Sequence, residues 1–388
     1  MRQTSLICTV SCFLLLSAAA SGDDDGNGAN VYVQHNLITD LSSGAARTDK
    51  TFMNPWGIEH SPTSPWWINV NGSGLSIVVD AAGNPAPASK PLRVTIPAPG
   101  GTGTSAPTGI VFNGTMDFQI GTAAPAIFLF ATEDGTISGW NNTVDPNNAV
   151  IKVNNSPAAV YKGITLGQMS GHNVIYAANF RGGTVDVFDA SFHPVTMSGT
   201  AFHDASLPTG FAPFNVQNID GSIYVTFAMQ DSFKHDDVPG PGMGYVDVFS
   251  ENGTLMQRLE HGNWLNSPWA VVKAPGEFGK MSNRLLIGNF GSGQIAAYQV
   301  ESGKFQTMPD GTDGKPLTID GLWGLKFGNG ALAGAENVLY FAAGINGEAD
   351  GLFGTLTPAG NGQNDDNNGD DNDNGNGNSH GKGHGKGR

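Results

Sequence analysis

The stretch NVIYAANFRGGTVDVFDA, residues 173–190, contains two short runs of β-branched and aromatic residues separated by a glycine turn. Runs of about four to eight such residues that end at Gly, Asn or Asp are typical of antiparallel strands. The neighbouring stretches AVYKGITLG, residues 159–167, and PVTMSG, residues 194–199, have the same character. This part of the sequence therefore predicts four short strands in succession.

The same pattern occurs six times along the chain. Each copy opens with an aromatic residue, proline or leucine and continues with β-formers: PWGI at Pro55, PTGI at Pro107, YKGI at Tyr161, PFNV at Pro213, PWAV at Pro268 and LWGL at Leu322. The third positions of these motifs are separated by 52, 54, 52, 55 and 54 residues. A period of about 50 residues with four antiparallel strands per copy predicts an all-β fold, a six-bladed β-propeller, as a single domain over residues 31–358.

The ends of this domain predict how the ring closes. The sixth copy has strands near residues 321–327, 338–343 and 351–357 but no fourth strand. The stretch VYVQHNLIT, residues 31–39, precedes the first copy and belongs to no repeat of its own. We predict that it supplies the fourth strand of the sixth blade, so that the ring has no exposed seam.

Composition and charge exclude several classes of protein. Gly accounts for 55 of 388 residues and charged residues for only 14%, whereas helical repeat proteins and coiled coils are rich in Ala, Glu, Lys and Leu. The formal net charge of −15 argues against a nucleic-acid partner and an anionic membrane surface, because both require clustered positive charge.

Both ends of the chain differ from the repeats. Residues 1–21 contain an early Arg, an apolar run and small residues, which predict a secretory signal peptide, followed by a short acidic linker at 22–30. We expect a secreted protein, extracellular or periplasmic, with no membrane span in the mature chain. Both cysteines, Cys8 and Cys12, lie in the signal, so the mature protein should be stabilised without disulfides. Residues 359–388, rich in Gly, Asn and Asp and ending in His, Lys and Arg, are expected to form a disordered tail.

Several strings resemble known propeller repeats. NVIYAANFRGGTVDVFD and NRLLIGNFGSGQIAAYQ resemble the second and third strands of NHL-type repeats, and all six blades share this resemblance to varying degrees. The strings NPWGIEHSPTSPWWINVNGSG, FATEDGTISGWN, GFAPFNVQNI and IDGLWGLKFGNG also resemble an uncharacterised secreted bacterial family. Some members of that family carry a C-terminal sorting segment, which this chain lacks. The resemblance implies a six-bladed propeller and export, and no assigned activity.

Polar residues recur where the inner strand of each blade begins and where its second strand turns into the third. These places face the same end of the central channel, so we predict a ligand site there, with eleven candidate ligand-binding residues: Asn54, Trp56, Asn71, Glu133, Asn179, Arg181, Asp231, His235, Asn289, Asp320 and Asn346. Other residues at this rim include Thr108, Asp134, Lys162, Asn215, Gln230, Trp269, Trp323, Glu348 and Asp350. A ring of Asn and Asp oxygens favours calcium as a cofactor, although no ligand set can be assigned. The alternative is that Asn and Asp only form turns and the Trp side chains only pack blades.

The fourth copy has an insertion, AMQDSFKHDDVPGPG, residues 228–242. Insertions in repeat proteins gather on loops and often on the binding face. This one carries His235 among Asp231, Asp236 and Asp237, and a His beside carboxylates can act as a general base. Asp231, His235 and Asp320 are therefore the catalytic candidates, His203 and Asp204 are expected nearby, and the alternative is an exposed polar lid.

Two hypotheses of function follow. The first is a monomeric binding or scaffold module for a glycan, a surface polymer or another small ligand, since the sequence has no G-x-S-x-G, H-E-x-x-H or P-loop motif. The second is a calcium-dependent hydrolase or lyase, because six-bladed propellers include lactonases and TIDGLWGL, with Asp320, resembles part of their signature. A third alternative is that the tail adheres to a matrix and the propeller is a rigid spacer.

Overall fold

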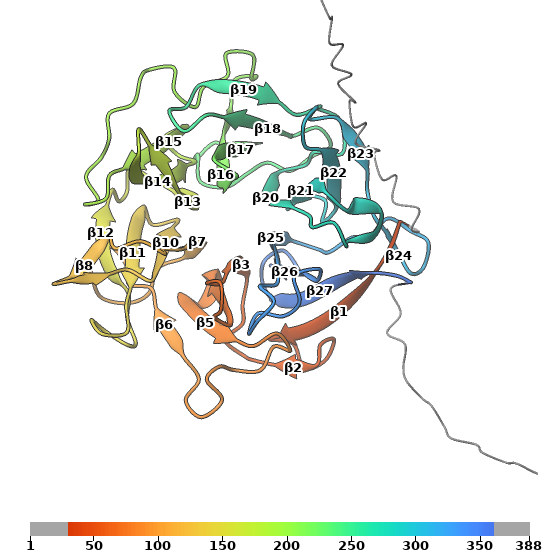
Figure 1. Cartoon of the computed structure of the whole chain (residues 1–388), viewed down its shortest axis with the longest axis horizontal. Helices are drawn as coiled ribbons and strands as arrows, with labels where there is room; N and C mark the ends of the chain where they lie inside the picture. Colours follow the sequence, from red (N-terminus) through yellow and green to blue (C-terminus); the bar gives the residue numbers. More distant parts are fainter. Residues whose placement is uncertain (1–29, 361–388) are drawn as a thin grey trace, which may run out of the picture.

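The structure is a computed structural model that describes residues 30–360. Six small antiparallel sheets surround a central axis like the blades of a propeller (Figure 1). The predicted signal peptide, almost all of the acidic linker and residues 361–388 of the predicted tail lie outside the described residues.

The first three blades follow one another along the chain. Blade one contains β3 (Pro55–Glu59), β4 (Trp66–Val70), β5 (Leu75–Val79) and β6 (Arg93–Thr95), with a 3-10 turn η1 (Asn71–Ser73). Blade two contains β7 (Pro107–Phe112), β10 (Phe128–Thr132), β11 (Thr136–Trp140) and β12 (Val150–Asn154), with an inserted hairpin of β8 (Gln119–Gly121) and β9 (Ala124–Pro125). Blade three contains β13 (Tyr161–Met169), β14 (His172–Asn179) and β15 (Thr184–Phe188).

The last three blades complete the ring. Blade four contains β16 (Phe211–Ile219), β17 (Ser222–Met229), β18 (Gly244–Phe249) and β19 (Leu255–Arg258). Blade five contains β20 (Pro268–Lys273), β21 (Arg284–Asn289), β22 (Ile295–Gln299) and β23 (Phe305–Thr307), with a 3-10 turn η2 (Gly279–Met281). Blade six contains β25 (Leu322–Phe327), β26 (Leu339–Ala343), β27 (Leu352–Pro358) and β1 (Val31–Thr39).

The predicted closure of the ring is supported in part, because the N-terminal strand joins the last blade in a sheet of mixed strand directions. Strand β1 pairs antiparallel with β27 along its length, and Figure 1 shows these two ends of the domain side by side. Two short strands, β2 (Arg47–Thr48) and β24 (Asp310–Gly311), pair parallel with β1. The sixth blade is thus built from both ends of the domain.

Blade three differs from the prediction in its outer strand. The segment 194–199, expected as a fourth strand, pairs with β15 only through a bridge between Phe188 and Pro194 and a bond from Val195 N–H to Val187 O. A turn then begins at Ser198, where the Ala201 N–H donates a hydrogen bond to Ser198 O. This turn directs the chain toward blade four. This blade therefore has a three-stranded sheet with a short outer appendage.

The recurrent motif gives each inner strand an irregularity at its second position. The pairing of β13 with β14 shifts between Tyr161 and Gly163, and the other five inner strands shift at or beside the equivalent place. Such bulges re-aim a side chain, here those of Trp56, Thr108, Lys162, Phe214, Trp269 and Trp323. Four of the six copies have glycine at the third position, where neighbouring inner strands converge: a Cβ added to Gly57 would lie 2.6 Å from Thr108 O. The fourth copy has Asn215 there, and its side chain fills the space beside Gly163.

Aromatic side chains close the axis of the ring at this level. The rings of Trp56 and Trp323 stack with centroids 3.5 Å apart, and Phe290 stacks on Trp323 at 3.9 Å. Trp269 meets both tryptophans edge-on, at 84°. Beyond this layer the channel holds a cavity of about 50 Å³ lined by the inner strands. The aromatic layer thus forms the floor of one channel mouth.

A buried carboxyl group in blade four predicts a pH dependence of stability. Asp247 is fully buried, its Oδ1 accepts a bond from Arg258 Nε at 3.1 Å, and Arg258 also pairs with Asp204. Asp247 Oδ2 has no partner within residues 30–360. Burial, reinforced by the Asp204 charge and opposed by Arg258, raises the pKa of Asp247 to about 7.

We expect Asp247→Asn to stabilise the protein at neutral pH. The folded state holds the Asp247 proton more tightly than the unfolded state does, so wild-type stability falls as pH rises from about 4 to about 7. Asparagine keeps the acceptor for Arg258 and removes this loss, which is on the order of 4 kcal/mol at pH 8. Urea unfolding at pH 5 to 8 should show an advantage that grows to pH 7. An advantage of equal size at every pH, or none beyond that of the exposed Asp220→Asn, would contradict this account.

Candidate functional site

The mouth above the aromatic layer carries a chain of hydrogen-bonded polar side chains from five of the six blades. They come from the turn between β26 and β27, from the residue before β3 and the residue after β4, and from the turn after β10. The others come from β13 and from the loop between β17 and β18. We call these seven residues the charged arc: Glu348, Asn54, Asn71, Glu133, Lys162, Asp236 and His235.

The first half of the charged arc is held by asparagine amides. Asn54 Nδ2 donates to Glu348 Oε1 at 3.1 Å and to Asn71 Oδ1 at 3.5 Å. Asn71 Nδ2 donates in turn to Glu133 Oε2 at 2.8 Å. Asn54 is anchored from below, since its Oδ1 accepts the indole N–H of Trp56 at 3.0 Å. The amides therefore fix two carboxylates at defined positions around the mouth.

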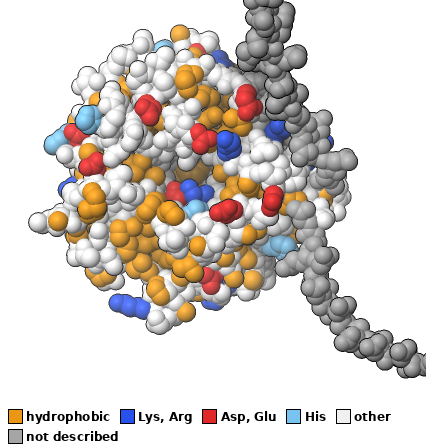
Figure 2. Space-filling model, viewed as in Figure 1, with side chains coloured by type: hydrophobic (Ala, Val, Ile, Leu, Met, Phe, Trp, Pro, Cys, Tyr) orange, Lys and Arg blue, Asp and Glu red, His pale blue; other side chains and the backbone are white. Residues whose placement is uncertain are grey.

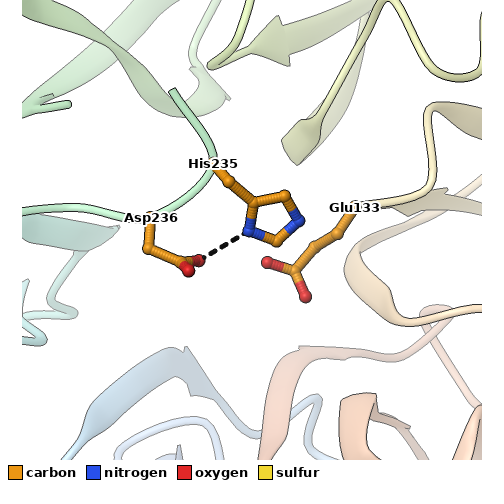
Figure 3. Close-up of side chains that lie close together, drawn as sticks. All are labelled: Glu133, His235 and Asp236. Atoms are coloured by element: carbon orange, nitrogen blue, oxygen red, sulfur yellow. Dashed lines mark hydrogen bonds and ion pairs between the residues drawn. The ribbon is translucent and has the colours of Figure 1, made fainter. Parts of the chain in front are cut away.

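The second half of the charged arc is centred on Lys162. Its ammonium donates to Glu133 Oε1 and to Asp236 Oδ1, the latter at 3.2 Å. His235 Nδ1 lies 2.9 Å from the same Asp236 oxygen. In Figure 3, His235 and Asp236 come from one side of the opening and Glu133 from the other, and their side chains point toward one another.

Lys162 is buried because of its place in the repeat. It occupies the bulge position that holds tryptophan in three other blades, and its side chain is 2% exposed. The ammonium lies over the rings of Trp56 and Phe180, 5.1 and 5.9 Å from their centroids. Burial alone would lower the pKa of Lys162, but the charges of Glu133 and Asp236 outweigh it and raise this pKa. The mouth therefore contains a permanent, preorganised cation.

The lid loop, residues 230–243, brings His235 and Asp236 over the mouth. Asp231 organises this loop: its Oδ1 accepts the backbone N–H groups of His235 and Asp236 at 2.8 and 3.3 Å. Gly240 N–H donates to Asn266 Oδ1 at 2.6 Å and fixes the far end of the loop on blade five. An Asp that bonds nearby backbone N–H groups is a common device for ordering a turn.

The carboxyl groups at this mouth titrate unequally. Asp236 is exposed, and although partial desolvation opposes ionisation, the adjacent Lys162 ammonium lowers the pKa of this carboxyl. Burial raises the pKa of Glu348, and the negative charges of Glu133 and Asp236 add to this. Burial also raises the pKa of Asp237. The Lys162 ammonium thus forms ion pairs with Glu133 and Asp236. Glu348 is hydrogen-bonded to the neutral amide of Asn54 instead.

The structure separates the eleven predicted ligand-binding residues into two groups. Five of them surround the mouth: Asn54, Trp56, Asn71, Glu133 and His235. The other six hold turns or face away from the centre: Asn179, Arg181, Asp231, Asn289, Asp320 and Asn346. In this second group, Asn179 accepts Gly182 N–H, Asn289 accepts Asn266 N–H and Asp320 accepts Asn346 N–H.

Of the catalytic candidates, only His235 belongs to the charged arc, since Asp231 and Asp320 accept backbone N–H groups. Asp204, expected near the lid loop, instead pairs with Arg258 on β19, and His203 is exposed. Three arc members were not among the eleven ligand-binding candidates, although the sequence placed Lys162 and Glu348 at this rim and Asp236 in the insertion. For Lys162 the signal was present, because a lysine replaces tryptophan at the bulge position of one repeat.

Relatives of known sequence place the chain in a family. Two uncharacterised proteins of Acanthamoeba polyphaga mimivirus, R648 and L690, are each 30% identical to it. The match to R648 spans 331 residues, 82% of this chain and 78% of R648, and that to L690 spans 329 residues, 82% and 84%. The chain belongs to the family of these two proteins. No family model matches it, so the NHL-type and bacterial resemblances stay predictions.

The solved structures that this chain resembles are more distant in sequence than the mimivirus relatives. A streptogramin B lyase structure matches 84% of this chain and 97% of its own, with a TM-score of 0.48 and 13% identity. The BBS1N chain in complex with ARL6DN matches 85% and 98%, with a TM-score of 0.43 and 10% identity. Neither similarity bears on the chemistry of the mouth.

Within residues 30–360, no helix is long and apolar enough to cross a membrane.

Three side chains of the charged arc also have the chemistry of metal ligands. Glu133, His235 and Asp236 each offer one ligand atom, and these atoms lie within 4.8 Å of one another. Two carboxylates and an imidazole suit a transition metal better than calcium, which prefers six to eight oxygens. However, the Lys162 ammonium already binds both carboxylates. A divalent ion at this place would either displace the Lys162 ammonium from these carboxylates or bind next to it against electrostatic repulsion.

The opposite mouth of the channel is also charged. There Lys326 Nζ lies 2.8 Å from Glu59 Oε1, and His60 Nε2 contacts Phe327 O at 2.9 Å. Figure 2 shows one face of the molecule, with basic, acidic and histidine side chains gathered where its centre is hollowed. The two mouths differ in their loops, because the charged arc alone includes side chains from a long insertion.

Proposed function

We propose that this member of the mimivirus-type family is an exported binding protein whose charged arc holds a glycan or another small polar ligand. The observation that carries the proposal is the arc itself: seven polar side chains from five blades, converging under a lid loop on an aromatic floor. Small-ligand sites in proteins typically combine an apolar base with a few convergent polar groups.

The arrangement of the arc suits recognition of a ligand with both donors and acceptors. Glu133, Asp236 and Glu348 accept hydrogen bonds, while Lys162 and the Asn54 and Asn71 amides donate them. Each side chain is restrained by at least one neighbour, so little side-chain entropy is lost on binding. Export is supported by the predicted signal peptide at residues 1–21 and by the acidic, lysine-poor composition.

A second candidate function is metal-dependent hydrolysis or elimination at the same mouth. The close approach of Glu133, His235 and Asp236 favours it. Such an enzyme would need the ion to bind beside Lys162, whose charge opposes it. We therefore rank binding first, and the two functions differ in whether the wild-type protein takes up a divalent ion.

Calorimetric titration with neutral, basic and acidic oligosaccharides tests the proposed function. We expect at least one class to bind the wild-type protein, and Glu133→Gln to weaken that binding at least tenfold because the buried Lys162 ammonium loses one of its two charged partners. Glu301→Gln, an exposed change in blade five, is the matched control and should leave affinity unchanged. Lack of binding by every class at millimolar ligand, or equal binding by Glu133→Gln, would overturn the proposal.

A further inference from the structure

Glu348 is the carboxylate of the charged arc that has no cationic hydrogen-bond partner within residues 30–360. Lys162 donates to Glu133 and Asp236, whereas Glu348 receives only the neutral amide of Asn54. The backbone holds Glu348 in place at some cost, since its φ of +68° lies in the left-handed region that non-glycine residues seldom adopt. A positively charged group next to Glu348 would complete the charge balance of the mouth.

A second and independent observation concerns Trp323 in the aromatic floor. Its side chain is 1% exposed, and its indole N–H has no hydrogen-bond partner within residues 30–360. This N–H lies next to Asn54 and Gly344, because a Cβ added to Gly344 would approach Asn54 Oδ1 and lie 3.3 Å from Trp323 Nε1. A buried donor without an acceptor is costly, so this position calls for an oxygen.

The lid loop adds an apolar surface beside these polar groups. Phe233 is 80% exposed, and Val238 and Met243 on the same loop are 42% and 37% exposed. Exposed aromatic and aliphatic groups can mark a surface that contacts a ligand, and Phe233 lies on the same loop as His235, two residues before it. The apolar face of a sugar ring has the size and chemistry to cover Phe233.

We propose that the charged arc recognises an amino sugar, with its ammonium on Glu348 and with a hydroxyl oxygen, or a water held by it, on the Trp323 N–H. This inference rests on the proposed function and specifies its ligand. An ammonium alone would satisfy Glu348 but leave the indole unpaired. A neutral sugar would do the reverse, and an acidic sugar would place like charges together. A polyhydroxylated amine satisfies both groups.

Titrations with glucosamine oligosaccharides and N-acetylglucosamine oligosaccharides of the same length test the inference, since acetylation converts the charged ammonium to a neutral amide on the same sugar ring. We expect the free amine form to bind the wild-type protein at least tenfold more tightly. Glu348→Gln keeps the acceptor for Asn54 and should abolish this preference, so that the two oligosaccharides bind the variant with equal affinity. Glu336→Gln, an exposed change near the opposite mouth, should keep the preference.

The outcomes separate the inference from the function on which it rests. Equal binding of the two oligosaccharides, with loss of binding in Glu133→Gln, would overturn the amino-sugar assignment and retain the binding site. Tighter binding of a lysine peptide than of glucosamine oligosaccharides would also overturn it, in favour of a peptide amine. Absence of binding by all oligosaccharides would overturn both.

Discussion

Replacing Lys162 with methionine should turn the mouth of the propeller into a divalent-cation site. The variant frees Glu133 and Asp236 beside His235, three groups whose ligand atoms already lie within 4.8 Å of one another. Methionine fits the position, because the side chain lies against Trp56 and Phe180 and other blades carry apolar residues there. We expect zinc to bind the variant and to raise its melting temperature, and EDTA to reverse the effect.

The wild-type protein is the essential comparison for this result. Its Lys162 ammonium should hold zinc and calcium affinity at least a hundredfold below that of the variant, which corresponds to about 2.7 kcal/mol. Lys273→Met removes an exposed ion pair with Asp220 and should behave like the wild type. Tight binding of calcium or zinc by the wild-type protein would contradict the role given to Lys162 and would favour the metal-dependent enzyme.

Replacing Tyr32 with alanine should cost about 3–5 kcal/mol of unfolding free energy. Tyr32 lies on the strand that closes the ring, is fully buried and packs on Phe278, with ring centroids 5.1 Å apart. Its hydroxyl donates to Phe278 O at 2.8 Å and accepts Met281 N–H at 3.0 Å, so it fastens β1 to blade five as well. Tyr32→Phe should cost less, about 1–3 kcal/mol, because only these two bonds are lost.

Equilibrium unfolding in urea measures both changes. His35→Ala lies on the same strand with an exposed side chain and should have almost no effect. If Tyr32→Ala were no more destabilising than His35→Ala, strand β1 would not belong to the cooperative unit. The closure of the ring by the two ends of the domain would then be of little energetic importance.

The fold could be predicted from the sequence because each blade is encoded by a short local pattern of strands and turns, and this pattern occurs six times. The six motifs from Pro55 to Leu322 fixed the number of blades, and the unassigned stretch at residues 31–39 identified the closing strand. The outer strand of blade three could not be predicted in the same way. Its residues 194–199 have the composition of a strand, and their departure from β15 depends on the connection to blade four.

The candidate site was predicted less completely for a physical reason. Repeat geometry identified the rim and the insertion, but not which rim side chains turn inward. Asn71, Asn179 and Asn289 all lie at the end of a second strand, yet Asn179 and Asn289 bond their own turns while Asn71 reaches Glu133. The reach of the lid loop across the ring, from blade four to Glu133 and Lys162, is a tertiary contact that no local pattern encodes.

A crystal structure of the protein with its tightest-binding oligosaccharide tests the central claim most directly. The account predicts ligand density in the mouth between Glu348 and His235, with an amine on the Glu348 carboxylate. Density at the opposite mouth, around Glu59 and Lys326, with the charged arc free of ligand, would contradict it.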